Sequence, residues 1–289
     1  MIGRRSLHVT AVCLLAFALG PAPAQPPQGA EGNRIAAALG QLRPQRPGIV
    51  DAFVIVAALD DDPVFGREAR EAGRVLARRF GAEGRSIVLA EDETGDRADA
   101  AGTPGNLALA LARTAALMDR DEDVLVLYTT SHGTPRAGIN YEHPVHGEGI
   151  LTPAQLATTL GQHGFRNRLI VIQSCFSGQF IPALASPRTL VATAASSMKP
   201  SFGCSPGNDW TFFGHALINQ AMRMPDTLIR QFRRALVTII GWEKKLGIDP
   251  SNPQLSIGSE TGAWLAALDA RAGSVPRAPV GRPPSELGE

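Results

Sequence analysis

The sequence predicts an α/β fold of three layers, in which helices cover both faces of a mainly parallel central sheet. Short apolar segments alternate along the chain with longer amphipathic ones, as in repeated βαβ units. The apolar segments are continuous runs, which is typical of strands buried on both faces. Strands that follow one another through helical crossovers become parallel neighbours, so a doubly wound sheet is expected.

The first elements alternate over the amino-terminal half of the chain. In order, we expect a helix Arg34–Leu42, a strand Phe53–Leu59, a helix Arg67–Phe80, a strand Ser86–Ala90 and a helix Pro104–Met118. The first helix ends before Pro44, because proline does not continue a helix. The last begins at Thr103-Pro104, where threonine can cap the helix and proline suits its first turn.

The alternation continues in the second half and then gives way to helices. In order, we expect a strand Val124–Thr130, a helix Pro153–Leu160 capped by Thr152, a strand Leu169–Gln173, a helical turn Phe180–Leu184, a strand Thr189–Ala194, helices Trp210–Arg223 and Pro225–Leu246, and a short strand Gln254–Ile257. From Arg271 the chain is rich in Pro, Arg and Gly without periodicity, which predicts a disordered tail.

The composition is that of an ordinary globular protein. Hydrophobic residues make up 44% of the 289 residues, charged residues 19%, and the net charge is +1. The arginines are scattered, so neither a nucleic-acid surface nor a polybasic membrane patch is predicted. The length suffices for one large α/β domain or two small ones.

The amino terminus has the features of an export signal. Arg4 and Arg5 precede the apolar stretch 9–19, and Pro21–Ala24 supplies small residues before Gln25. The alternative is a retained anchor helix, but the apolar stretch is shorter than the roughly 20 residues that a membrane span requires. We therefore expect residues 1–24 to be removed and the mature protein to have no membrane attachment. Residues 25–48 then form a helical and linker segment.

Two of the predicted strands end in reactive side chains. His132 follows the strand Val124–Thr130, and Cys175 follows Leu169–Gln173. If these strands are parallel neighbours, both side chains emerge at the carboxyl edge of the sheet, where open α/β sheets bind their ligands. A thiol beside an imidazole makes a cysteine nucleophile with its base. Gly133 lets a backbone N–H approach a substrate carbonyl and, with the N–H of Cys175, could form an oxyanion hole.

The remaining cysteines leave one question open. Cys13 lies inside the export signal, so the mature protein would keep Cys175 and Cys204. In an oxidising compartment these two could form one disulfide, which would silence the nucleophile.

The residues around the strand ends resemble a known family. Thr130-Ser-His-Gly133 and Gln173-Ser-Cys-Phe-Ser-Gly178 are similar to the signature segments of the legumain-like cysteine peptidases, peptidase family C13, in the clan that contains the caspases. The similarity continues through residues 194–204 and 208–214, which resemble the bacterial exported branch, and covers Asp51–Gly258. It implies a caspase-like domain at residues 49–260, a carboxyl-terminal segment at 261–289, and export to the periplasm or the medium.

The resemblance also implies roles for individual residues. His132 matches the catalytic histidine and Cys175 the nucleophile. Asp209 matches the acidic residue at the base of the primary specificity pocket, and Arg67 matches that pocket's arginine. Gln173 stands where the family usually has Glu. The family's Asn before the pocket arginine has no counterpart here, so the sequence predicts a Cys–His dyad only.

The expected activity is that of a cysteine endopeptidase without cofactor or metal, acting on peptides or proteins. An asparagine side chain offers both donors and an acceptor, which Arg67 and Asp209 can satisfy, so cleavage after Asn with Asp as second choice is predicted. Two alternatives stay open: a caspase-like binding protein that has lost activity, and a transpeptidase that resolves the same acyl-enzyme with an amine. The sequence does not predict an oligomeric state.

Two further motifs are weak evidence for a functional site. Gly203–Gly207 fits the G-x-S-x-G pattern, but Pro206 interrupts it and it lacks the strand–turn–helix context, so a loop is predicted. His143 and His146, with the acidic residues of 142–148, are weak evidence for a metal site. A flexible loop beside the cleft is the favoured interpretation of residues 138–149.

Overall fold

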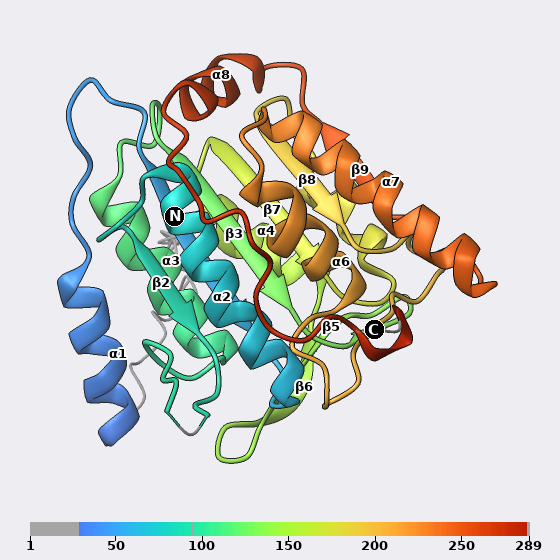
Figure 1. Cartoon of the computed structure of the whole chain (residues 1–289). Coiled ribbons are helices and arrows are strands. Elements are labelled where there is room, and N and C mark those ends of the chain that lie inside the picture. The colour runs from blue at the N-terminus through green and yellow to red at the C-terminus, as the bar shows by residue number, and fades with distance from the viewer. Residues whose placement is uncertain (1–28, 94, 288–289) are drawn as a thin grey trace, which may run out of the picture.

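The centre of the computed structural model, which describes residues 29–93 and 95–287, is a six-stranded sheet (Figure 1). Its strands are β1 (Ala52–Ala58), β2 (Ser86–Leu89), β3 (Val124–Thr130), β7 (Asn167–Gln173), β8 (Thr189–Thr193) and β9 (Gln254–Ile257). Their order across the sheet is β2-β1-β3-β7-β8-β9, and all neighbours are parallel except β9, which runs antiparallel to β8. The predicted mainly parallel sheet is confirmed. The expected export signal lies outside the described residues.

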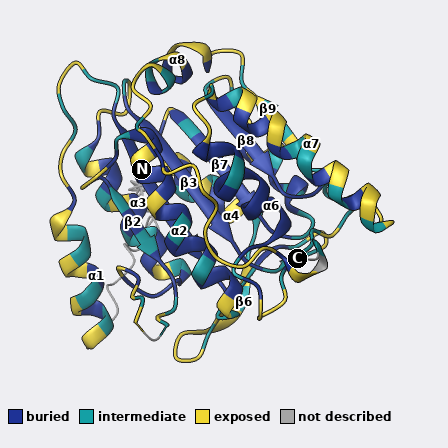
Figure 2. Ribbon diagram, viewed as in Figure 1, coloured by how far each residue is buried: buried dark blue, intermediate teal, exposed yellow. Residues whose placement is uncertain are grey.

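Helices cover both faces of this sheet, as predicted. One face carries α2 (Pro63–Phe80), α6 (Phe212–Gly214), α7 (Leu228–Leu246) and α8 (Gly262–Ala270); the other carries α3 (Pro104–Leu117), α4 (Pro153–Gln162) and α5 (Ile181–Leu184), with α1 (Ala30–Gln41) outside α3. Successive strand residues point to opposite faces, so Val54 and Val56 enter one core while Phe53 and Ile55 enter the other. Figure 2 shows the strands buried between exposed outer helix faces.

The helix boundaries follow local capping chemistry. The Thr103 side chain accepts a hydrogen bond from Asn106 N at the start of α3, and Thr152 forms a reciprocal capping box with Gln155 at the start of α4. Helix α2 begins at Pro63, four residues earlier than its periodicity predicts, and ends at Phe80, before the C-cap Gly81, whose φ is 58°. No helix in the described part of the chain is long and apolar enough to cross a membrane.

The segment 138–149, predicted as a flexible loop, forms strands instead. The strands β4 (Gly133–Thr134), β5 (Gly138–His143) and β6 (Gly147–Leu151) form a small antiparallel sheet. The prediction of a loop was wrong because the buried Ile139, with Tyr141 and Leu151 packed against the same cluster, anchors the hairpin to the core. Both ring nitrogens of His143 have protein partners. Nδ1 accepts hydrogen bonds from the backbone N–H groups of Val145 and His146, and Nε2 lies 2.8 Å from Glu91 Oε1.

The predicted helix Trp210–Arg223 forms, but its geometry changes along its length. After α6 the backbone is π-helical over His215–Gln220 and then turns as a short 3₁₀ segment. The amides of Asn219 and Gln220 lie 3.0 and 3.1 Å from the two ring nitrogens of His215. Burial lowers the pKa of His215 to about 4, so this imidazole is a neutral structural group.

The carboxyl-terminal segment is ordered against the domain, contrary to the predicted disordered tail. It runs from α8 along the face that carries α2 and α6, and is coloured dark red in Figure 1. Trp210 Nε1 donates to Val280 O at 2.8 Å, and Val280 N donates to Asn219 Oδ1 at 2.9 Å. Val275 is buried. The prediction failed because the backbone partners of this segment lie on distant elements, which composition does not reveal.

Candidate active site

His132 and Cys175 emerge at the same edge of the sheet. Strands β3 and β7 are parallel neighbours in a register that pairs Thr130 with Gln173, and Ser131 N donates to Gln173 O at 3.1 Å. His132 lies two residues beyond Thr130, and Cys175 lies two residues beyond Gln173. The parallel pairing of these two strands, which the two apolar runs predicted, is therefore confirmed.

Gly133 lies directly against the backbone of Cys175. A Cβ atom on Gly133 would overlap the carbonyl oxygen of Cys175, so the close approach of the two loops requires glycine. Asn140 N donates to His132 O at 3.0 Å, and Gly133 pairs opposite Ile139. In such an antiparallel ladder Gly133 occupies the non-hydrogen-bonded position, so its N–H points away from β5.

The Cys175 thiol is held by the loop before α6. Its Sγ accepts a hydrogen bond from Ser201 N at 3.3 Å and lies 3.7 Å from the Ser201 hydroxyl. The next residue, Phe176, has a φ of 57°, a strained conformation for a residue with a side chain, which costs about 1 kcal/mol or more. Its N–H donates to Lys199 O at 2.9 Å, and this bond holds the turn in place.

His132 contacts a carboxylate and a second thiol. Its Nε2 lies 2.9 Å from Asp62 Oδ2, and its ring packs edge-on against Phe65 with centroids 4.9 Å apart. The Cys204 thiol lies near the same ring and raises its pKa. Within the described residues the Cys175 thiol hydrogen-bonds with Ser201, and Cys204 is the thiol that raises the pKa of the imidazole. Both cysteines are free thiols.

The surroundings of His132 favour its charged form. The hydrogen bond with Cys204 raises the pKa of His132 most, burial opposes it, and Asp62 and Asp60 raise it further, to about 9. Asp62 and Cys204 were missed by the sequence analysis. The position of Asp62 could have been predicted from the sequence. Asp60, Asp61 and Asp62 follow β1, which is a parallel neighbour of β3, so they lie at the same edge of the sheet as His132.

Arg67 and Asp209, two of the expected pocket residues, are brought together. Arg67 Nη1 lies 3.4 Å from Asp209 Oδ1 and donates to Asn208 O at 2.6 Å, while its Nε pairs with Glu93. The third expected pocket residue is elsewhere. Gln173 is buried on the sheet face beneath α2, and its Oε1 lies 3.4 Å from the Thr130 hydroxyl.

A buried carboxylate, Glu68, lies on that same face. It accepts hydrogen bonds from the Tyr128 hydroxyl at 2.6 Å and from Thr211 N and Oγ1, both at 2.8 Å. Burial raises the pKa of Glu68, because these donors only partly replace water. Glu68 and Gln173 are thus the polar side chains that face the core beneath the site, and of the two only Gln173 was singled out, by the resemblance to the family.

The Asp209 carboxylate is covered by the chain's own carboxyl-terminal segment. Arg282 donates to it through its backbone N at 2.6 Å and through Nη2 at 3.0 Å. Burial raises the pKa of Asp209, but the bonds from Arg282 outweigh this effect and hold it below the ordinary value. Arg282 therefore competes with any other donor for this carboxylate.

The edge of the sheet is acidic. Oxygen atoms of Asp60 and Asp62 and a ring nitrogen of His132 lie within 4.8 Å of one another, as do oxygens of Asp60, Asp61 and Glu142. Asp62 and His132 already pair with each other, and we assign neither as a metal ligand.

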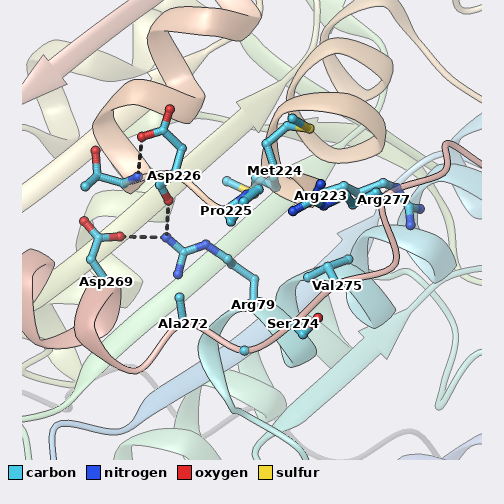
Figure 3. Close-up of a pocket in the computed structure, with 13 residues that line it drawn as sticks. Arg79, Arg223, Met224, Pro225, Asp226, Asp269, Ala272, Ser274, Val275 and Arg277 are labelled. Atoms are coloured by element: carbon cyan, nitrogen blue, oxygen red, sulfur yellow. Dashed lines mark hydrogen bonds and ion pairs between the residues drawn. The ribbon is translucent and has the colours of Figure 1, made fainter.

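A cavity of about 520 Å³ lies at the other end of α2 (Figure 3). Arg79, in the last turn of α2, lines it and pairs with Asp269 at 2.6 Å. Helix α2 starts beside His132 and is about 27 Å long at 1.5 Å per residue, so this cavity is remote from the two thiols.

Part of the chain matches the model of a known protein family. The model of the peptidase C13 family matches residues 103–263, a range that contains His132, Cys175, Cys204 and Asp209. Among solved structures, caspase-1 from Spodoptera frugiperda is similar with 13% identity and a TM-score of 0.45, over 75% of this chain and 88% of that one. No curated protein sequence matches the chain significantly.

Proposed function

The chain belongs to the peptidase C13 family of cysteine peptidases, and we propose that it is an endopeptidase with Cys175 as nucleophile and His132 as proton donor. The observation that carries this proposal is the pairing of β3 with β7, which brings the two residues to one edge two positions beyond a paired Thr130 and Gln173. The charged state favoured for His132 supports it, since a protonated imidazole stabilises a thiolate.

The proposed reaction proceeds through an acyl-enzyme. The Cys175 thiolate attacks the peptide carbonyl carbon, and the N–H groups of Gly133 and Cys175 bind the developing oxyanion. His132 donates its proton to the leaving amine as the C–N bond breaks. The neutral imidazole then takes a proton from water, which attacks the thioester and releases the acid product.

The pKa of His132 predicts how the rate depends on pH. Activity needs the imidazolium, which is present below a pKa of about 9 and is lost as the pH rises through it. We expect kcat/KM on an Asn-containing fluorogenic peptide to fall roughly tenfold for each unit above that pH, as for loss of one essential proton. A rate that still rises above pH 10 would contradict this.

We propose cleavage after Asn, with Asp as second choice. The contact between Arg67 and Asp209 supports a pocket that offers a donor and an acceptor together. Gln173 is left out of this pocket, because its contact is with Thr130.

Asp209→Asn should reduce kcat/KM for Asn substrates by about 10- to 100-fold, because one hydrogen bond to a charged group is weakened. Asp121→Asn is the matched control: this exposed aspartate pairs with Arg166 and precedes β3, at the opposite edge of the sheet. Peptide-library profiling of both variants measures the effect. A wild-type preference for basic or large apolar residues would refute the proposed specificity.

We also propose that the protein is exported, because residues 1–24 have the features of an export signal.

Transfer of the acyl group to an amine would use the same catalytic residues as hydrolysis. Mass spectrometry of products formed with and without an added amine acceptor separates the two reactions.

A further inference from the structure

We propose that Asp62 is a positioning residue that orients the His132 imidazole for proton transfer, which extends the Cys–His dyad to a third residue. The inference rests on the proposed function. It corrects the expectation, drawn from the missing family asparagine, that no third group assists the histidine.

The contact itself is short and specific. Asp62 Oδ2 lies 2.9 Å from His132 Nε2, within hydrogen-bond distance, although the two residues are 70 positions apart in the chain. A carboxylate on one ring nitrogen fixes the orientation and the protonation of that nitrogen. The other nitrogen, Nδ1, is then the one that exchanges a proton with a sulfur or a leaving amine.

The backbone around Asp62 holds its carboxylate in place. Asp62 is the N-cap of α2: its carbonyl oxygen accepts from Phe65 N at 3.0 Å, and its own N–H donates to Asp60 Oδ1 at 3.1 Å. Pro63 follows and restricts the turn further. Phe65, one turn into the same helix, packs edge-on against the His132 ring. Two side chains from the start of α2 thus hold the imidazole.

Helix capping does not account for this aspartate. An aspartate at an N-cap usually accepts a hydrogen bond from the N–H two or three residues later, which stabilises a helix by about 1 kcal/mol. Asp62 makes no such side-chain bond. Its carboxylate is turned toward His132 instead, and only its backbone serves the helix.

The acidic residues around His132 differ in how they lie relative to the imidazole, so the role of Asp62 can be tested against that of Asp61. Asp60 and Asp62 come from the β1–α2 connection, Cys204 from the loop before α6, and Cys175 from the end of β7. Glu142 on β5 faces Asp60 and Asp61. Asp61 carries the same formal charge as Asp62, but its carboxylate lies near Asp60 and Glu142 and does not act on the imidazole. A general effect of negative charge would make Asp61 and Asp62 equivalent, whereas positioning would not.

The test compares Asp62→Asn with Asp61→Asn, each of which removes one negative charge. For Asp62→Asn we expect kcat/KM at pH 7 to fall by about 10- to 100-fold, mainly through kcat, because a misplaced imidazole transfers its proton poorly. The fall in rate at alkaline pH should begin at lower pH. NMR titration of the His132 ring should show the same downward shift of its pKa. Asp61→Asn should stay within about twofold of wild type in rate.

Two outcomes would overturn the inference. One is an Asp62→Asn enzyme with wild-type kcat and an unshifted alkaline limb. The other is an equal pKa shift of His132 in Asp61→Asn and Asp62→Asn, which would indicate a general field. Thermal unfolding of each variant checks that the fold is kept, and the NMR titration does not depend on turnover. Failure of the proposed function is separate, since it would appear as a wild-type protein without peptidase activity.

Discussion

Replacing Cys175 with alanine should reduce peptide hydrolysis by about four to six orders of magnitude, as removal of the nucleophile does in other acyl-transfer enzymes. The fold should be unaffected, because Cys175 is only half-buried and, among the described residues, its thiol hydrogen-bonds only with Ser201. The measurement is single-turnover and steady-state cleavage of an Asn-containing fluorogenic peptide, with thermal unfolding as a check on folding.

Cys204→Ala is the matched variant, because it removes the thiol that contacts His132 without removing the proposed nucleophile. We expect this enzyme to remain active but the alkaline fall in its rate to begin at a lower pH than in the wild type, because the group that raises the pKa of His132 most is gone. If Cys204→Ala were inactive while Cys175→Ala kept its rate, the nucleophile would be Cys204. If wild type were inactive as well, the chain would be a binding protein with the family's fold.

Labelling by iodoacetamide gives the same comparison without a substrate. A thiolate paired with an imidazolium reacts fast near neutral pH, whereas an inert buried thiol does not. Mass spectrometry assigns the label to Cys175 or Cys204. Slow labelling of both would contradict a catalytic thiolate in the resting protein.

Gly133→Ala should have the second-largest effect, a fall in kcat of about 100- to 1,000-fold, the usual cost of losing one oxyanion-hole donor. The added Cβ would overlap the carbonyl oxygen of Cys175, so the loop that carries His132 must move away from the loop that carries the thiol. Because the clash lies between the two reacting loops, it should change kcat much more than KM.

Gly161→Ala is the control for this variant. A Cβ at Gly161, within α4, would meet open space, so activity should be unchanged and the helix slightly more stable. Comparing the two variants separates the effect of crowding at the strand ends from that of a lost glycine. A Gly133→Ala enzyme with wild-type kcat would show that this N–H does not bind the oxyanion.

Much of the fold was predictable because its signals are local. Continuous apolar runs such as Val124–Thr130 mark strands buried on both faces, and cap residues such as Thr152 mark helix starts. The small antiparallel sheet was not predictable in the same way. Its strands are mostly polar, and the burial of Ile139, which pins them, depends on what packs over the edge of the main sheet.

The sequence by itself determined the succession along the chain of the six strands of the central sheet and of most of the helices, and the edge at which His132 and Cys175 appear. These follow from hydrophobic periodicity and from the parallel arrangement of successive βαβ strands, which depend on neighbouring residues. Only the tertiary structure decided which groups meet at that edge: Asp62 with His132, Cys204 with the same ring, and Arg282 with Asp209. Such contacts join loops about 70 positions apart, and their partners depend on how whole elements pack, which no local pattern encodes.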